Sequence, residues 1–187
     1  MSKTYYDTPL WDSSLSIEER LDYLLSEMTL EEKIQSMGTG NPEIERLGVP
    51  AFQVGGEAAH GVQARHDQKF DDNEPDLTTI FQNPIGMSAS FDEELIRKAG
   101  KVVGTEVRGL YSREHKGSLS VWAPTIDMER DPRWGRTEEA YGEDPLLTGK
   151  MAGAYVEGLQ GEDDHYLLTA ATLKHFYANN VEEGRVW

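Results

Sequence analysis

The sequence contains no cysteine, so disulfide bonds and thiolate metal sites are excluded. It also lacks an apolar run long enough to span a bilayer, and its N-terminal residues lack the apolar stretch of a signal peptide. The absence of cysteine is compatible with a reducing compartment. We therefore expect a soluble cytoplasmic protein without a membrane partner.

Basic residues are scarce. The 18 lysines and arginines face 34 aspartates and glutamates, which gives a formal net charge of -16 at pH 7. A surface of this sign cannot neutralise a run of phosphates, and an anionic membrane repels it. The sequence therefore predicts neither nucleic acid nor membrane as a partner, and the acidic excess is first of all a source of solubility.

The 187 residues, 37% of them apolar, are enough for one domain with a substantial core. Capping boxes at Ser16/Glu19 and Thr29/Glu32 predict two helices, the second running through Met37. A longer helix is expected after Asp92, and another from Asp144-Pro145 to Gly161. The apolar stripes of these last two helices are Leu95, Ala99, Val102, Val103, Val107 and Leu110 in the first, and Leu146, Met151, Tyr155 and Leu159 in the second.

Strands are expected at residues 50–54, 84–88, 119–123 and 167–176. Alternation of strands with helices favours an α/β fold with a mostly parallel sheet, doubly wound or closed into a barrel. Residues 1–15 are expected to form an N-terminal arm and residues 16–187 one domain. A complete (β/α)8 barrel needs eight strands and about 250 residues, so about four strands suggest that only the first half of such a barrel is present.

Three polar clusters follow predicted strands, at residues 57–61 (EAAHG), 122–144 (WAPTIDMERDPRWGRTEEAYGED) and 174–175 (KH). Ligands of parallel α/β proteins bind at the carboxyl ends of strands, so these clusters are expected to meet. Arginine, lysine, histidine and carboxylate groups together suit a polyhydroxylated ligand, because each hydroxyl both donates and accepts. Trp122 and Trp134 offer a stacking face or, alternatively, core packing.

The motifs in these clusters closely resemble glycoside hydrolase family 3. The resemblance rests on DPRWGR at residues 131–136, EAYGEDP at 139–145, KHF and ANN at 174–180, EAAHGV at 57–62, and MTLEEKI at 28–34. It implies an N-terminal (β/α)8 TIM-barrel-type domain of a retaining, exo-acting β-glycosidase that removes terminal β-linked glucose or xylose. The loop at residues 174–180 departs from the KHFPGHG pattern of the family's N-acetylglucosaminidases, which disfavours that branch.

By matching positions, the resemblance implies that Arg136, Lys174 and His175 hold sugar hydroxyls and that Glu57 is a sugar-binding carboxylate. His60 and Gly61 are expected to shape their loop. Asp131 and Arg133 are expected to tie the 131–136 loop down through a charged hydrogen-bond pair. These assignments concern binding only.

No catalytic residue is assigned. Retaining hydrolysis needs two carboxyl groups roughly 5 Å apart, one as nucleophile and one as acid/base. The family carries its nucleophile on a later strand and its acid/base in a following domain, and neither motif occurs in this sequence. Asp127, Glu139 and Glu143 are therefore interpreted as loop and helix-start carboxylates.

No cofactor is expected, and no metal site, because the histidines lack ligand spacing. The expected partners are a small carbohydrate and the remainder of the enzyme, or a chain that completes the barrel. The alternative is a non-catalytic sugar-binding or interaction module made from a partial barrel, which would need a partner chain or a dimer to cover its sheet edge.

Overall fold

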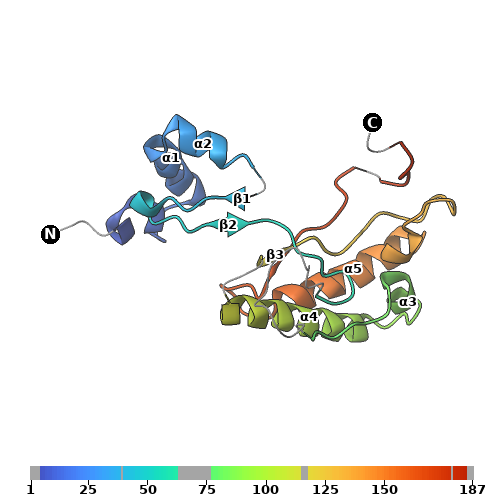
Figure 1. Ribbon diagram of the computed structural model, residues 1–187. Helices are drawn as coiled ribbons and strands as arrows, with labels where there is room; N and C mark the ends of the chain where they lie inside the picture. Colours follow the sequence, from blue (N-terminus) through green and yellow to red (C-terminus); the bar gives the residue numbers. More distant parts are fainter. Residues whose placement is uncertain (1–4, 39, 63–76, 115–117, 178, 185–187) are drawn as a thin grey trace. The chain divides into compact units, whose positions relative to one another are not determined.

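The computed structural model describes residues 5–38, 40–62, 77–114, 118–177 and 179–184. The chain forms two compact units, Met1–Val54 and Gly55–Trp187. The division between the two units falls between Val54 and Gly55, and the N-terminal arm expected at residues 1–15 stays a prediction. Both helices and strands occur in each unit (Figure 1). Within the described residues, no helix has the length and apolarity needed to cross a membrane.

Local capping organises the first unit. Helices α1 (Ile17–Glu27) and α2 (Leu30–Gln35) each begin with the predicted capping box. The second helix ends two residues before Met37, because glycines at positions 38 and 40 follow directly. Two 3-10 turns, η1 (Tyr5–Asp7) and η2 (Pro9–Trp11), precede them, and a third, η3 (Glu45–Leu47), follows. Strands β1 (Gly40–Asn41) and β2 (Phe52–Gln53) pair antiparallel, so this pair departs from the expected parallel sheet.

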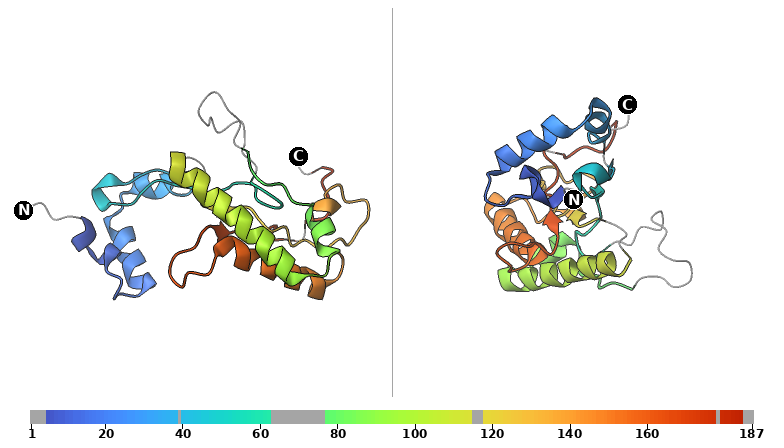
Figure 2. Two further views of the ribbon diagram at one scale, coloured as in Figure 1. Left: turned by 90° about the horizontal axis from the view of Figure 1, so that it is seen from below. Right: turned by 90° about the vertical axis from the view of Figure 1, so that its left-hand side faces the viewer.

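Two long helices build the second unit. Helix α4 (Glu93–Glu114) lies along α5 (Pro145–Gln160), as Figures 1 and 2 show. Asp144 caps α5 and Gly161 ends it, both as predicted. The buried residues of the two helices include Ile96, Ala99, Val103, Val107, Met151, Tyr155 and Leu159.

The buried face of α4 is rotated from the predicted stripe. Ile96, absent from that stripe, is fully buried, whereas Leu95 and Val102 are exposed. Gly100 and Gly104 lie against the backbone of α5. Because Ile96 is on the same side of α4 as these glycines, that side is the buried one. In α5, Leu146 is also exposed, contrary to the prediction.

Glycines bring the two helices into backbone contact. A Cβ atom at Gly100 would lie 2.4 Å from the carbonyl oxygen of Tyr155, and one at Gly158 would lie 2.2 Å from that of Arg97. Neither distance is compatible with a side chain. The close packing of α4 on α5 thus depends on residues that carry none.

A short parallel pair runs through the second unit. Strand β3 (Ser120–Val121) pairs with β4 (Ala170–Ala171), with Ser120 opposite Ala170. A parallel bridge between Thr125 and Lys174 extends the alignment. The predicted strands at residues 119–123 and 167–176 therefore lie side by side and parallel, although each is shorter than expected.

The strand predicted at residues 84–88 is wrong, because this segment is helix α3 (Pro84–Ser88). Pro84 occupies the first helical position, where its fixed φ favours a helix and its missing N–H costs nothing. The Met87 amide donates to the Asn83 carbonyl at 3.0 Å, which closes the turn. A five-residue apolar run cannot by itself distinguish the two structures.

Candidate functional site

Backbone hydrogen bonds bring the three polar clusters together. The Trp122 amide donates to the Gly56 carbonyl at 2.8 Å, which places the segment before Glu57 beside β3. On the other side, the Ile126 amide donates to the Lys174 carbonyl at 2.7 Å, and the Lys174 amide donates to that of Pro124 at 3.1 Å. The clusters are thus neighbours at one end of β3 and β4, where ligands of parallel α/β proteins bind.

Lys174 lies between two glutamates. Its ammonium nitrogen is 3.4 Å from a carboxylate oxygen of Glu57 and 3.8 Å from one of Glu139. The lysine side chain is only 16% exposed, whereas those of Glu57 and Glu139 are 27% and 28% exposed. The lysine is therefore recessed between carboxylates that reach solvent.

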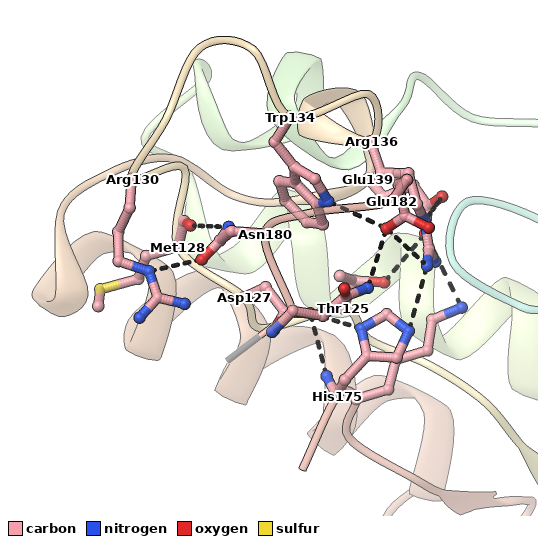
Figure 3. A network of polar contacts seen from close by, with 12 residues as sticks. Thr125, Asp127, Met128, Arg130, Trp134, Arg136, Glu139, His175, Asn180 and Glu182 are labelled. Atoms are coloured by element: carbon pink, nitrogen blue, oxygen red, sulfur yellow. Dashed lines mark hydrogen bonds and ion pairs between the residues drawn. The ribbon is translucent and has the colours of Figure 1, made fainter. Parts of the chain in front are cut away.

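Arg136 is held by Glu139. Its Nε and Nη2 atoms each donate to a different carboxylate oxygen, both at 2.6 Å (Figure 3). The remaining terminal nitrogen, Nη1, lies 3.3 Å from Nε2 of His175 and 3.7 Å from Glu182. The hydrogen bonds that Arg136 donates to Glu139 raise the pKa of Arg136 above its usual value. Burial opposes ionisation of Glu139, but the Arg136 hydrogen bonds, the Arg136 charge and the Lys174 charge outweigh it and lower the pKa of this carboxyl.

Asp127 anchors the segment that carries His175. Its side chain is 2% exposed. One carboxylate oxygen accepts from the His175 backbone amide at 3.0 Å and is 2.6 Å from Nδ1 of the same residue. The other oxygen accepts from the Asn179 amide at 3.0 Å. A single buried carboxylate thus ties His175 and Asn179 to the 122–144 segment. Figure 3 shows the contacts between Asp127 and His175.

Trp134 belongs to the packing around the site. It is 3% exposed, and its indole N–H donates to Glu182 at 3.1 Å. The same glutamate oxygen accepts from the Asn179 side chain at 3.0 Å. Of the two roles that the sequence left open for Trp134, core packing agrees with this burial. Trp122 is half-buried and lies against Gly55, where a Cβ atom would approach its ring to 2.8 Å.

Asp131 and Arg133 form their own pair outside this network. The guanidinium of Arg133 donates to both oxygens of Asp131, at 2.9 and 2.6 Å, and the Arg133 amide donates to one of them. Arg133 is 88% exposed. The predicted loop-bracing pair is therefore present. His60 contacts the Phe81 carbonyl through Nδ1 at 3.2 Å, which suits its expected role in shaping a loop.

The structure joins all four residues that the sequence selected, Glu57, Arg136, Lys174 and His175. It adds three carboxylates that sequence reasoning did not select as site residues: Asp127, Glu139 and Glu182. The spacing of Arg136 and Glu139 was the one available signal, because residues three apart in a turn can pair. No described group of three or more histidine, aspartate or glutamate side chains is arranged to hold a metal ion.

The network carries an excess of negative charge. Two cations, Arg136 and Lys174, face four carboxylates, so the formal charge is +2 - 4 = -2 with a neutral His175. Such a site repels an anionic ligand. Its mixture of donors and acceptors instead suits the hydroxyl groups of a neutral polyol.

Comparison with known proteins identifies the family. Residues 29–185 match the family model "Glycosyl hydrolase family 3 N terminal domain". The chain belongs to glycoside hydrolase family 3. It is 39% identical over 178 residues to exo-1,4-beta-xylosidase bxlB of Emericella nidulans, covering 95% of this chain and 23% of that protein. It is 42% identical over 175 residues to beta-xylosidase/alpha-L-arabinofuranosidase 1 of Medicago sativa subsp. varia, covering 91% of this chain and 22% of that protein.

Solved structures of family 3 enzymes resemble the chain as well. A family 3 exo-beta-xylosidase in complex with a xylobiose aziridine probe aligns with a TM-score of 0.81 and 34% identity, over 97% of this chain and 23% of the xylosidase. A beta-glucosidase of Kluyveromyces marxianus in complex with glucose aligns with a TM-score of 0.70 and 34% identity, over 87% and 18% of the two chains. The chain thus spans less than a quarter of the length of these relatives.

Proposed function

We propose that this chain is the sugar-binding N-terminal portion of a retaining, exo-acting β-glycosidase that removes terminal β-linked xylose or glucose from oligosaccharides or glycosides. In this proposal it contributes about the first half of a (β/α)8 barrel, and the remainder of the enzyme or a partner chain completes it. The family relationship supports a hydrolase, and the relatives named above are xylosidases and glucosidases. A cytoplasmic location remains a prediction from the sequence.

The observation that carries the proposal is the convergence of Glu57, Arg136, Lys174 and His175 in one network. They come from three segments far apart in the sequence. Together they offer carboxylate acceptors, an ammonium, a guanidinium nitrogen and an imidazole nitrogen, linked to one another through Glu139 and Lys174. Each hydroxyl of a sugar needs both a donor and an acceptor, and this set provides both.

The carboxylates of the network have binding and supporting roles in this proposal. Asp127 already accepts from two backbone amides, and Glu139 already accepts from two guanidinium nitrogens of Arg136. A nucleophile in retaining hydrolysis must instead face the anomeric carbon, with an acid/base carboxyl about 5 Å away. We therefore place the catalytic pair outside this chain.

Calorimetric titration of the 187-residue chain with xylose and with glucose tests the proposal. We expect saturable binding of at least one sugar, weakened about tenfold or more by Arg136→Ala, since a hydrogen bond to a charged group contributes about 1.5–3 kcal/mol. Arg133→Ala is the matched control, because Arg133 is another forked arginine of the same loop but lies outside the network. Absence of binding, or equal loss in both variants, would contradict the proposed site.

A measurement of the molecular mass in solution, made on the same sample, distinguishes a portion of a larger enzyme from a self-contained sugar-binding module. A chain that binds sugar as a stable dimer, with its sheet edge covered, would favour a non-catalytic sugar-binding module. A chain that is monomeric, or that needs the remaining polypeptide for stability, agrees with a portion of a larger enzyme.

A further inference from the structure

The imidazole of His175 lies between an acceptor and a donor. Its Nδ1 atom is 2.6 Å from a carboxylate oxygen of Asp127, and its Nε2 atom is 3.3 Å from the Nη1 nitrogen of Arg136 (Figure 3). Asp127 is buried, and both of its oxygens also accept from backbone amides, those of His175 and Asn179. The carboxylate therefore acts on the ring as a fixed acceptor.

Only one form of the ring satisfies both neighbours. A carboxylate that accepts from backbone amides requires a proton on Nδ1, and a guanidinium has donors but no acceptor. The neutral ring with its proton on Nδ1 donates to Asp127 and presents a lone pair at Nε2 to Arg136. The opposite neutral form would direct a lone pair at the carboxylate and an N–H at the guanidinium. A doubly protonated ring would also direct an N–H, and a positive charge, at Arg136.

We propose that Asp127 is a positioning residue that fixes His175 as the neutral Nδ1–H tautomer, so that Nε2 accepts a hydrogen bond from a hydroxyl of the bound sugar. The sugar part of this inference rests on the proposed function. Free histidine in water favours the opposite neutral tautomer, so the selection must come from the protein. His175 then acts as an acceptor in recognition and has no proton at Nε2 to give to a leaving group.

The neighbouring arginine makes a hydroxyl the fitting ligand at this point. A hydroxyl that inserts into the Arg136–His175 contact can replace Nη1 as the donor to the single lone pair of Nε2 and can itself accept from Nη1. Glu139 accepts from the other two nitrogens of Arg136, Nε and Nη2, and the third nitrogen, Nη1, faces His175. A group that only accepts hydrogen bonds could draw Nη1 away from Nε2 but could not replace it as the donor. Asp127 thus orients His175, the acceptor for this hydroxyl, and Glu139 orients Arg136, the donor.

Nitrogen NMR of the chain labelled with ¹⁵N-histidine tests the tautomer directly. Long-range ¹H–¹⁵N correlations distinguish the two neutral forms, and His175→Gln assigns the signal of His175 by its disappearance. Spectra over a range of pH identify the neutral ring. We expect a protonated Nδ1 and an unprotonated Nε2 in the wild type. A neutral His175 with its proton on Nε2 would overturn the proposal without the need for any variant.

The variant Asp127→Asn tests whether the aspartate makes the selection. We expect the Nε2–H form to become populated and the affinity for xylose or glucose to fall about tenfold. Asp131→Asn is the control, since Asp131 lies in the same segment and pairs with Arg133 outside the network. A folded Asp127→Asn chain with an unchanged His175 tautomer would also overturn the proposal.

The two readouts separate this inference from the proposed function. If the wild type binds neither sugar, the proposed function fails, while the spectrum still decides whether Asp127 sets the tautomer. If sugar binds and His175 carries its proton on Nε2, the proposed function stands and this inference fails. If Asp127→Asn does not fold, the wild-type spectrum alone decides.

Discussion

Arg136 and Glu139 form a forked ion pair in which two guanidinium nitrogens each donate to a different carboxylate oxygen at 2.6 Å. Both side chains are less than one-third exposed, at 19% and 28%. A planar guanidinium can satisfy both oxygens at once, which an ammonium cannot do. This pair orients the arginine that we place in the sugar site and brings a carboxylate next to Lys174.

Acidification should remove the stabilisation that Glu139 provides. The pKa of Glu139 lies below its ordinary value of 4.5 in the folded chain, so the ionised form favours folding. Its contribution is fully present above the ordinary value and is lost as the pH falls through the folded value. Urea unfolding of wild type and Glu139→Gln, from neutral pH down to about pH 3, should show a difference in unfolding free energy that shrinks on acidification. A difference that stays constant or grows would contradict this account.

Lys174 should contribute to sugar affinity through its charge. We expect Lys174→Ala to weaken binding of xylose or glucose by the 187-residue chain about tenfold or more, because a hydrogen bond from an ammonium is lost. Lys101→Ala provides the control, since it removes an exposed ion pair with Glu162 whose atoms are 2.8 Å apart. Calorimetric titration measures both. Equal affinities in wild type and Lys174→Ala would remove this lysine from the site.

Asp131 should titrate at low pH without affecting recognition. Hydrogen bonds from Arg133 lower the pKa of its carboxyl to about 2. Carboxyl-carbon NMR should show this value in the wild type and a return toward the ordinary 3.8 in Arg133→Ala. Sugar affinity should stay unchanged in that variant. A marked loss of affinity would mean that this pair supports the site after all.

Alanine substitutions at two glycines of α5 should have opposite effects on the unfolding free energy, because only one of these glycines contacts α4. A Cβ atom at Gly158 would lie 2.2 Å from the Arg97 carbonyl oxygen, whereas one at Gly153 would have no neighbour within 4 Å. We expect Gly158→Ala to lower the unfolding free energy by about 1–3 kcal/mol. Gly153→Ala should raise it by up to about 1 kcal/mol, because alanine favours a helix. Urea unfolding that shows the same effect for both would refute the close backbone packing.

Signals confined to a few residues predicted the helices best. The capping boxes of α1 and α2 and the cap of α5 lie where the sequence placed them, because a cap needs only one side chain and amides two or three residues away. Burial was harder to predict. Ile96 was missed because the contact with α5, and not the helix itself, decides which side of α4 is buried.

The residues of the candidate site also fall into those that the sequence could predict and those that it could not. Residues at strand ends could be selected from their order and from the family motifs, and the structure brings them together. The carboxylates that support them could not be selected from the sequence, because a segment with many acidic residues does not show which of these residues is buried. Asp127 becomes an anchor only because the loop around His175 and Asn179 folds back onto it, a contact across about fifty positions of sequence.

Hydrolysis of an aryl β-xyloside tests the central claim most directly. The assay compares the 187-residue chain with a chimera in which this chain replaces the aligned 178 residues of the Emericella nidulans xylosidase. We predict no turnover by the chain alone, turnover by the chimera, and a loss in kcat/KM of about tenfold or more for the chimera with Arg136→Ala but not with Arg133→Ala. Inhibitor-sensitive turnover by the chain alone, or a folded chimera that is equally active without Arg136, would contradict the account.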